Sequence, residues 1–172
     1  MMKRKLVQNI VFLLVPTLFI AGFGYKINLL LPRDQVFIIP SDFEGVLIRV
    51  FGQKDGTDSQ YEGDNLVYRF PESGVLILES ERPATGGAIT FYFEDSLGAR
   101  EFVKYVYPTD NLLSLNQNKK YAYGALNRLG LDGEDEVRYS TVIIGKLSHS
   151  DSLSEISNSL NISRILKEQS HE

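Results

Sequence analysis

Acidic side chains come closest to offering chemistry in this sequence. Glu79 and Glu81 stand two positions apart, and Glu94 and Asp95 are adjacent. A glycosidase needs only two carboxyl groups, set about 5–10 Å apart according to its stereochemical course. Acid-rich loops also supply such pairs by chance. The pairs therefore define a hypothesis of carboxylate-dependent hydrolysis without assigning a catalytic residue.

A second acidic feature is the run from Asp132 to Glu136, DGEDE. Its oxygen atoms are of the kind that bind Ca²⁺. The run lacks the alternating acidic pattern of an EF-hand loop, and a solvated turn is the simpler interpretation. We predict no metal site and no cofactor.

Histidine and cysteine chemistry is scarce. His149 precedes the last predicted helix and His171 is the penultimate residue, so a catalytic triad or a multi-histidine metal site is not expected. The chain has no cysteine, which removes disulfides, thiolate ligands and cysteine nucleophiles. Gly86 and Gly87 are followed by neither lysine nor a helix, so they do not form a phosphate loop. The sequence predicts a protein that is not an enzyme.

Short β-rich runs separated by Gly and Pro carry these side chains. No segment of helical period lies between the runs, which favours an antiparallel β-sandwich or barrel over a parallel sheet. Two hairpins are predicted, one around Glu72-Ser73-Gly74 and one around residues 94–100. Residues 111–135 show no clean period, and we place one short strand there, near 121–125. The other predicted strands are 35–39, 45–51, 66–70, 75–78, 88–93, 101–107 and 136–147.

One amphipathic helix is predicted near the C-terminus, at about residues 151–167. Ser152 and Glu155 match a capping box, in which each residue satisfies a backbone N–H of the other. Leu153, Ile156 and Leu160 fall on one helical face. That stripe predicts a helix that covers a face or an edge of a sheet, and a partner-binding helix is the alternative.

The N-terminal segment indicates export. Lys3, Arg4 and Lys5 precede an apolar run from Leu6 to Tyr25, and this arrangement favours a cytoplasmic N-terminus with the rest of the chain carried across a membrane. We therefore predict two parts. Residues 1–31 form a cytoplasmic basic tip plus a transmembrane anchor or signal peptide, and residues 32–172 form an extracytoplasmic β-domain.

The fate of the N-terminal segment has two alternatives. A spanning helix needs about 20 apolar residues, whereas Ile10 to Tyr25 supplies 16 residues free of charge, Gln and Asn. The apolar residues after Lys26 lengthen the span if the ammonium reaches the headgroups. Gly22 and Gly24 are small enough for signal peptidase, so secretion after cleavage near Gly24 is the alternative. We favour the uncleaved single-pass anchor in the cell membrane.

Charge also limits the partners of the exported part. Beyond position 26 the chain holds 14 basic and 22 acidic residues, a net charge of about −8. Such a domain should not bind nucleic acid through its general electrostatic field. Its roughly 140 residues suffice for one domain with a substantial core.

Two stretches resemble an uncharacterised family of bacterial exported proteins, often lipoproteins. They are Ile38–Ile48 (IIPSDFEGVLI) and Tyr68–Leu76 (YRFPESGVL). They match I-P-x-x-[YF]-x-G-x-[VI] and Y-x-[IF]-P-x-[SN]-G-[IV], and 141–145 (TVIIG) followed by the helix resembles the family's ending. The resemblance covers about residues 35–160 and implies a transthyretin-like or similar small β-sandwich. It implies no activity, and the lipid-bearing cysteine of many members is missing here.

The motif residues have structural explanations. Pro40 and Pro71 end strands because proline lacks the ladder N–H. Gly74 supplies a positive φ in its turn, and Phe43 belongs to the packing of the domain. Tyr68, Phe70 and Gly45 are assigned structural roles in the same way.

A non-enzymatic, membrane-tethered module of the bacterial envelope or surface is the predicted function. Its partners would be the membrane, through the N-terminal helix, and a protein or glycan in the envelope. The alternatives are a carboxylate-dependent hydrolase and an accessory subunit of a membrane complex.

Overall fold

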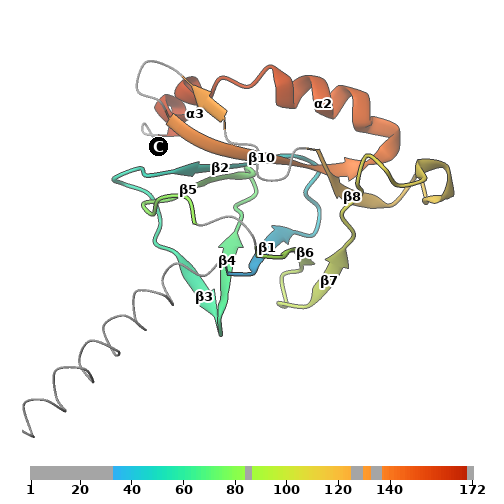
Figure 1. Cartoon of the computed structure of the whole chain (residues 1–172), viewed down its shortest axis with the longest axis horizontal. Helices are drawn as coiled ribbons and strands as arrows, with labels where there is room; N and C mark the ends of the chain where they lie inside the picture. The colour runs from blue at the N-terminus through green and yellow to red at the C-terminus, as the bar shows by residue number, and fades with distance from the viewer. Residues whose placement is uncertain (1–32, 84–86, 125–129, 133–136, 170–172) are drawn as a thin grey trace, which may run out of the picture. The chain divides into compact units, whose positions relative to one another are not determined.

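The computed structural model of the protein describes residues 33–83, 87–124, 130–132 and 137–169 (Figure 1). The predicted anchor or signal peptide within residues 1–31 lies outside these ranges. Among the residues that the structure describes, no helix is long and apolar enough to cross a membrane.

Five strands form the first sheet, in the order β3-β4-β1-β6-β7. Its central strand, β1 (Gln35–Pro40), is parallel to both of its neighbours, β4 (Asn65–Arg69) and β6 (Ile89–Glu94). The edge strands β3 (Gln60–Glu62) and β7 (Arg100–Val103) are antiparallel to the strands beside them. The three central strands therefore end at the same edge of the sheet.

The second sheet has the order β5-β2-β10-β8. Its long strand β10 (Val137–Lys146) is antiparallel to β2 (Gly45–Phe51), to β8 (Lys120–Tyr123) and to β9 (Gly130–Asp132). At the other side β5 (Val75–Ile77) is parallel to β2. The fold is mainly β, as predicted from the sequence.

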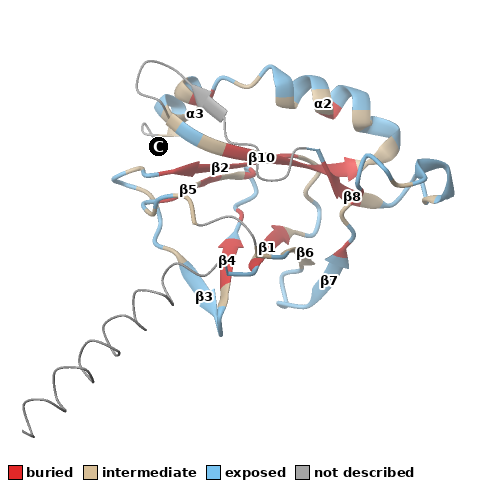
Figure 2. Cartoon of the chain, in the orientation of Figure 1, coloured by how far each residue is buried: buried red, intermediate tan, exposed pale blue. Residues whose placement is uncertain are grey.

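Strand β2 shows how the layers pack. Leu47 and Phe51 join the core shared by the two sheets, whereas Ile48 and Val50 on the opposite face join a second core with the C-terminal helices. Both faces of β2 are consequently buried, and Figure 2 shows most of the strand in red. The described part of the chain thus has three layers: sheet, sheet and helices (Figure 1).

A buried arginine joins the two sheets. Arg49 in β2 is 4% exposed; its Nε donates to Ser140 Oγ (3.0 Å) and its Nη1 to Gln35 Oε1 (2.9 Å). Its guanidinium carbon lies 4.4 Å from the ring centroid of Phe37 and 4.6 Å from that of Tyr68. Burial lowers the pKa of Arg49 to about 10. Amide, hydroxyl and aromatic groups thus replace the water around this cation.

The prediction of a wholly antiparallel sandwich is wrong, because both sheets are mixed. The chain turns after β1 and enters the second sheet as β2, and it turns after β4 and enters the second sheet as β5. These two sheet-crossing corners lie side by side, so β1 pairs in parallel with β4 and β2 pairs in parallel with β5.

The same crossing overturns one predicted hairpin. Residues 66–70 and 75–78 do not pair with each other, since β4 and β5 belong to different sheets. The other hairpin is confirmed, because β6 and β7 are antiparallel neighbours. The strand predicted near 121–125 corresponds to β8. Strand β3 is not among the strands predicted from the sequence.

Two helices stand where one was predicted. A short 3₁₀ turn, η2 (Leu147–His149), leads into α2 (Ser150–Asn158), and α3 (Ile162–Gln169) follows. The predicted capping box is absent, because Ser152 lies inside α2 and its hydroxyl donates to the His149 carbonyl (3.0 Å). A separate 3₁₀ turn, η1 (Leu112–Ser114), lies between β7 and β8.

Candidate functional site

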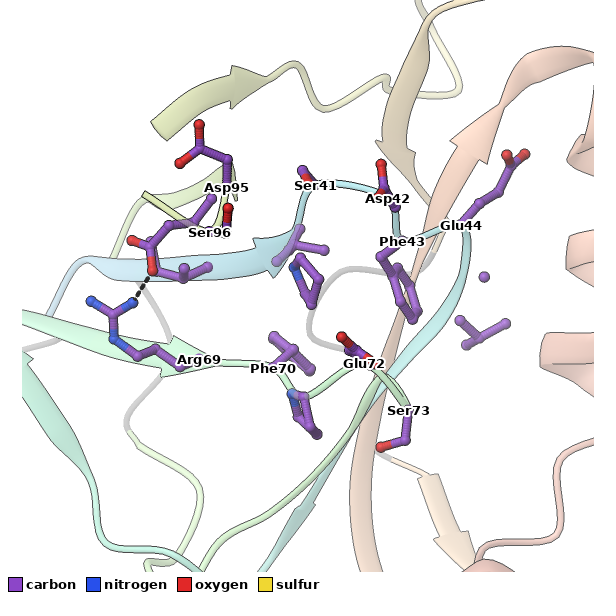
Figure 3. A pocket seen from close by; sticks show the side chains of 17 residues that line it. Ser41, Asp42, Phe43, Glu44, Arg69, Phe70, Glu72, Ser73, Asp95 and Ser96 are labelled. Atoms are coloured by element: carbon purple, nitrogen blue, oxygen red, sulfur yellow. Dashed lines mark hydrogen bonds and ion pairs between the residues drawn. The ribbon is translucent and has the colours of Figure 1, made fainter. Parts of the chain in front are cut away.

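An open cleft of about 1170 Å³ lies where the three parallel strands of the first sheet end (Figure 3). Each of β1, β4 and β6 contributes the turn that follows it. Because the C-terminal ends of parallel neighbours meet at one edge, segments far apart in sequence share this cleft. Its walls are Ile38–Val46, Arg69–Ser73 and Glu94–Ser96.

Phe43 joins the first two walls. Its ring lies against two glycines, and a β-carbon on Gly45 would come 3.4 Å from Phe43 Cζ. A β-carbon on Gly74 would come within 2.6 Å of the same atom, closer than real contacts allow. Gly74 also has a φ of +72°, which glycine adopts at little cost. The positive φ predicted for Gly74 is confirmed, and this glycine has a packing role as well.

Hydrogen-bond acceptors dominate the cleft. All three walls carry carboxylates, and Figure 3 shows Asp42, Glu72 and Asp95 on three different turns. Arg69 is the basic side chain among the lining residues, and it is engaged in ion pairs. The serine hydroxyls of the lining donate as well as accept. The side chains of the lining thus offer more acceptors than donors.

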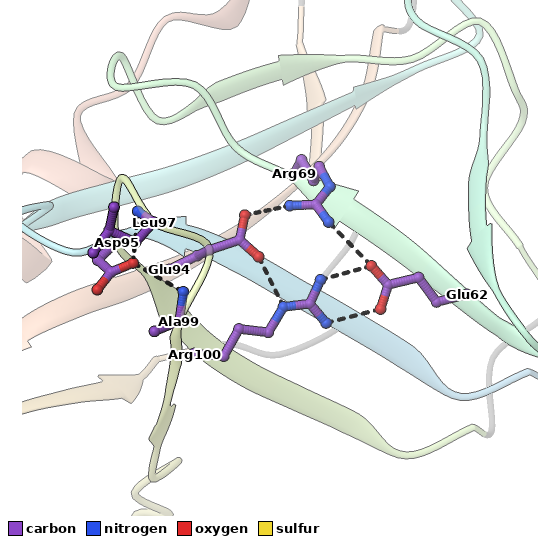
Figure 4. A network of polar contacts seen from close by, with 7 residues as sticks. All are labelled: Glu62, Arg69, Glu94, Asp95, Leu97, Ala99 and Arg100. Atoms are coloured by element: carbon purple, nitrogen blue, oxygen red, sulfur yellow. Dashed lines mark hydrogen bonds and ion pairs between the residues drawn. The ribbon is translucent and has the colours of Figure 1, made fainter.

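Four charged side chains form a closed ring beside the cleft, here called the ionic quartet (Figure 4). Arg69 bridges Glu62 (3.0 Å) and Glu94 (2.5 Å), and Arg100 bridges the same two carboxylates at 2.6 and 2.8 Å. Hydrogen bonds from Arg100 lower the pKa of both glutamates and raise that of Arg100. Glu94 is therefore held as an anion.

The adjacent acids Glu94 and Asp95 have different structural roles. Whereas Glu94 belongs to the ionic quartet, Asp95 Oδ1 accepts hydrogen bonds from the backbone N–H groups of Leu97 (2.9 Å) and Ala99 (2.8 Å). Asp95 thereby closes the β6–β7 turn. Both acids line the cleft, but their carboxylates are engaged in separate contacts (Figure 4).

The turn between β1 and β2 is fastened to the second sheet. Glu44 Oε1 accepts a hydrogen bond from the Lys146 backbone N–H (3.2 Å) and lies 2.8 Å from His149 Nδ1. Burial raises the pKa of Glu44, but the hydrogen bonds from His149 and Lys146 outweigh it and the net shift is downward. Lys120 Nζ donates to the carbonyls of Asp42 (2.9 Å) and Phe43 (3.0 Å).

The remaining sequence candidates lie elsewhere. Glu79 and Glu81 are exposed and absent from the cleft lining, and Glu81 pairs with Arg138 at 3.1 Å. Asp132 ends β9, whereas residues 133–136 and His171 lie outside the described ranges. Within those ranges, no group of three or more His, Asp or Glu side chains is arranged to hold a metal ion.

Sequence reasoning missed the cleft itself. The two motifs on which the resemblance rests supply two of its three walls, and their residues were explained one by one as strand ends and packing. The explanation holds for the aromatic pair, since Tyr68 and Phe70 are buried in the core between the sheets. The missing signal was the parallel pairing of β1 with β4, which brings the two motifs side by side.

Comparison with known proteins places this mainly β, two-sheet domain in a family. The chain belongs to the family of unknown function DUF6843, whose model matches residues 32–151. The match includes all three cleft walls and every strand. The expectation of an uncharacterised family is thereby confirmed.

One solved structure is similar at low identity. It is described as a "putative lipoprotein from Bacillus anthracis" and shares 15% sequence identity with a TM-score of 0.48, over 66% of this chain and 71% of that one. Comparison with curated proteins found no match.

Proposed function

We propose that this protein is a non-enzymatic module of the bacterial envelope that binds a protein or glycan ligand in the cleft. The observation that carries the proposal is the convergence of three turns on one open, acceptor-rich cleft. Both motif segments and the third wall fall within the family match. In this proposal the N-terminal segment tethers the domain to the cell membrane, with the domain outside the cytoplasm.

The chemistry of the lining narrows the ligand. Carboxylates and hydroxyls accept hydrogen bonds from sugar hydroxyls, and carboxylates also pair with lysine or arginine side chains. Phe43, which is half-buried, adds apolar surface to one wall. A hydroxyl-rich glycan and a basic protein segment are the two ligand classes that fit.

The pKa shifts of two cleft carboxylates favour binding over a role for those two groups as a general acid. A catalytic general acid needs a raised pKa, so that it keeps its proton at working pH. Glu44 and Glu94 are shifted the other way, toward the anion. Carboxylate-dependent hydrolysis remains the rival proposal. An accessory role in a membrane complex would be one form of protein binding.

The binding proposal is tested with paired variants. Asp42→Asn combined with Glu72→Gln removes two charges from the cleft lining, and Glu79→Gln combined with Glu81→Gln removes two outside it. Affinity of the full chain is measured for purified cell-wall glycan strands and for a lysine-rich peptide. We expect the cleft variant to bind one of these probes at least about tenfold more weakly than the control variant. Equal affinity of both variants, or no binding of either probe by the wild type, would overturn the proposal.

The tether is tested by cell fractionation and N-terminal sequencing of the mature protein. We expect an uncleaved N-terminus in the membrane fraction. A mature protein that begins at Tyr25 and is recovered in the soluble fraction would exclude the anchor, although the cleft proposal would stand.

A further inference from the structure

The end of the β-domain opposite the cleft is the end where the described chain begins. β1 runs from Gln35 to Pro40, and its last three residues, from Ile38 on, line the cleft. A strand of six residues spans about 20 Å at ~3.3 Å per residue. The body of the cleft and the first described residues therefore lie at opposite ends of β1.

The connection to the preceding segment is short. When the predicted span includes the apolar residues after Lys26, it ends at Leu31, and β1 begins at Gln35. Three intervening residues reach about 10–11 Å even when fully extended. If residues 6–31 contain a membrane anchor, the start of β1 must lie close to the headgroup layer.

The first described residues are fixed to the domain. The Asp34 carbonyl accepts a hydrogen bond from the Leu66 N–H (2.9 Å), and Asp34 Oδ1 accepts one from the Ala88 N–H (2.8 Å). Gly87 lies so close that a β-carbon there would come within 1.8 Å of the Arg33 carbonyl oxygen. The chain thus enters the domain without a free hinge at these residues, which restricts how the domain can tilt.

Two side chains at this end suit a lipid interface. The Arg33 guanidinium carbon lies 5.0 Å from the ring centroid of Tyr61, and Tyr61 is 54% exposed. Tyrosine is enriched at the headgroup level because its ring is apolar and its hydroxyl is polar. A guanidinium binds phosphate through paired hydrogen bonds.

We propose that this end of the domain rests on the lipid headgroups through Arg33 and Tyr61. The proposal rests on the membrane tether within the proposed function and names the surface that tether brings into contact with lipid. Arg33 pairs with a headgroup phosphate while Tyr61 lies among the headgroups. The cleft then opens away from the membrane, toward ligands in the envelope.

Neighbouring charges indicate which lipid to use as the probe. Asp34 uses its carboxylate on the Ala88 N–H, and Glu62 is held in the ionic quartet. Asp58 and Asp64 flank β3 in sequence and add negative charge. A strongly anionic membrane surface would repel these acidic side chains. Phosphatidylcholine instead offers a phosphate group on a lipid without net charge. Contact is therefore expected with zwitterionic vesicles and with little dependence on salt.

Tryptophan fluorescence tests the orientation, because the chain has no tryptophan of its own. The full chain carrying Tyr61→Trp is reconstituted into phosphatidylcholine vesicles with brominated acyl chains, which quench tryptophan near the bilayer. The matched control is Leu97→Trp in the β6–β7 turn at the cleft end, where Leu97 is 92% exposed. We expect blue-shifted, strongly quenched emission from the Tyr61→Trp variant and unshifted, unquenched emission from the control. Arg33→Gln added to Tyr61→Trp should reduce the quenching.

The outcomes separate this proposal from the binding function. Flotation with the vesicles but equal quenching of the two reporters, or no quenching of Tyr61→Trp, would overturn the orientation alone. Failure of the full chain to float would remove the tether and this proposal together. Ligand binding by the cleft is measured separately and is unaffected by either result.

Discussion

Phe43 is the residue that links the two motif segments. Its ring occupies the space that a side chain at Gly74 would need, lies in contact distance of Gly45, and packs against the core between the sheets. The ring thus excludes a side chain at Gly74, whereas at Gly45 an added β-carbon would only touch it. Both corners must pass close to the same aromatic ring for the cleft walls to meet.

Gly74→Ala should lower the free energy of unfolding by more than the cost of placing an alanine at a positive φ. Gly63→Ala is the matched control, because Gly63 has a similar φ of +61° and no atom within 4 Å of an added β-carbon. The control should lose about 1–2 kcal/mol, the cost of a left-handed alanine. Gly74→Ala should lose about 1–3 kcal/mol more through overpacking against Phe43, as measured by urea denaturation.

A second variant isolates the ring contact in that experiment. Phe43→Leu shortens the side chain that an alanine at Gly74 would meet, so it should recover part of the extra loss when combined with Gly74→Ala. Equal free energies of unfolding for the two glycine variants would contradict the packing role.

At the scale of elements, the ionic quartet joins strands that are distant in sequence. Glu62 comes from β3, Arg69 from β4, Glu94 from β6 and Arg100 from β7. Each carboxylate is bound by both guanidinium groups. The quartet therefore ties four strands of the first sheet together across its surface.

The quartet should make stability depend on pH in the acid range. The pKa values of Glu62 and Glu94 are lowered in the folded state from the usual 4.5. As the pH falls, the unfolded chain takes up protons first, so the stabilisation is present above about pH 4.5 and lost below it. The free energy of unfolding should fall less steeply from pH 6 to pH 3 in Glu62→Gln combined with Glu94→Gln. Parallel pH profiles for variant and wild type would contradict this.

The C-terminal helices stabilise the second sheet through few side chains. Ile162 of α3 is fully buried in the second core, between the second sheet and the C-terminal helices, whereas Ile156 of α2 is 51% exposed. Ile162→Ala should lower the free energy of unfolding by about 2–5 kcal/mol, because it leaves a cavity. Ile156→Ala, the control, should stay within about 0.5 kcal/mol of wild type. A similar loss in both variants would mean that the helices do not pack on the sheet as described.

At the scale of the whole molecule, the two ends of the β-domain differ in character. One end holds the acceptor-rich cleft, and the other holds Arg33 and Tyr61 beside the start of the described chain. In the proposed arrangement the first end meets ligand and the second meets lipid.

The topology of this arrangement is testable by cysteine labelling, since the chain has no cysteine. Ser73→Cys places a thiol at the cleft, and Met2→Cys places one in the predicted cytoplasmic tip. A membrane-impermeant maleimide should label Ser73→Cys in intact cells and Met2→Cys only after permeabilisation. Labelling of Met2→Cys in intact cells would contradict the predicted orientation.

The sequence alone predicted the local elements well. Alternating residues in 45–51 and the apolar run in 136–147 gave strands β2 and β10 within one or two residues, because strand patterning depends on near neighbours. Pro40 ends β1 and Pro71 follows β4, as the missing ladder N–H requires. The β6–β7 hairpin could also be predicted from the sequence, because the residues that form its turn are neighbours in the chain.

Only the tertiary structure decided which strands pair and what they build. A Pro-Glu-Ser-Gly turn is compatible with a hairpin or with a corner between sheets, and the choice depends on the partners β1 and β2, which lie some 30 residues away. The burial of Arg49 could not be predicted from the local sequence either, because its partners Gln35 and Ser140 lie on other strands. The local patterns specified strands and turns, but the cleft exists because nonlocal parallel pairing brings three strand ends to one edge.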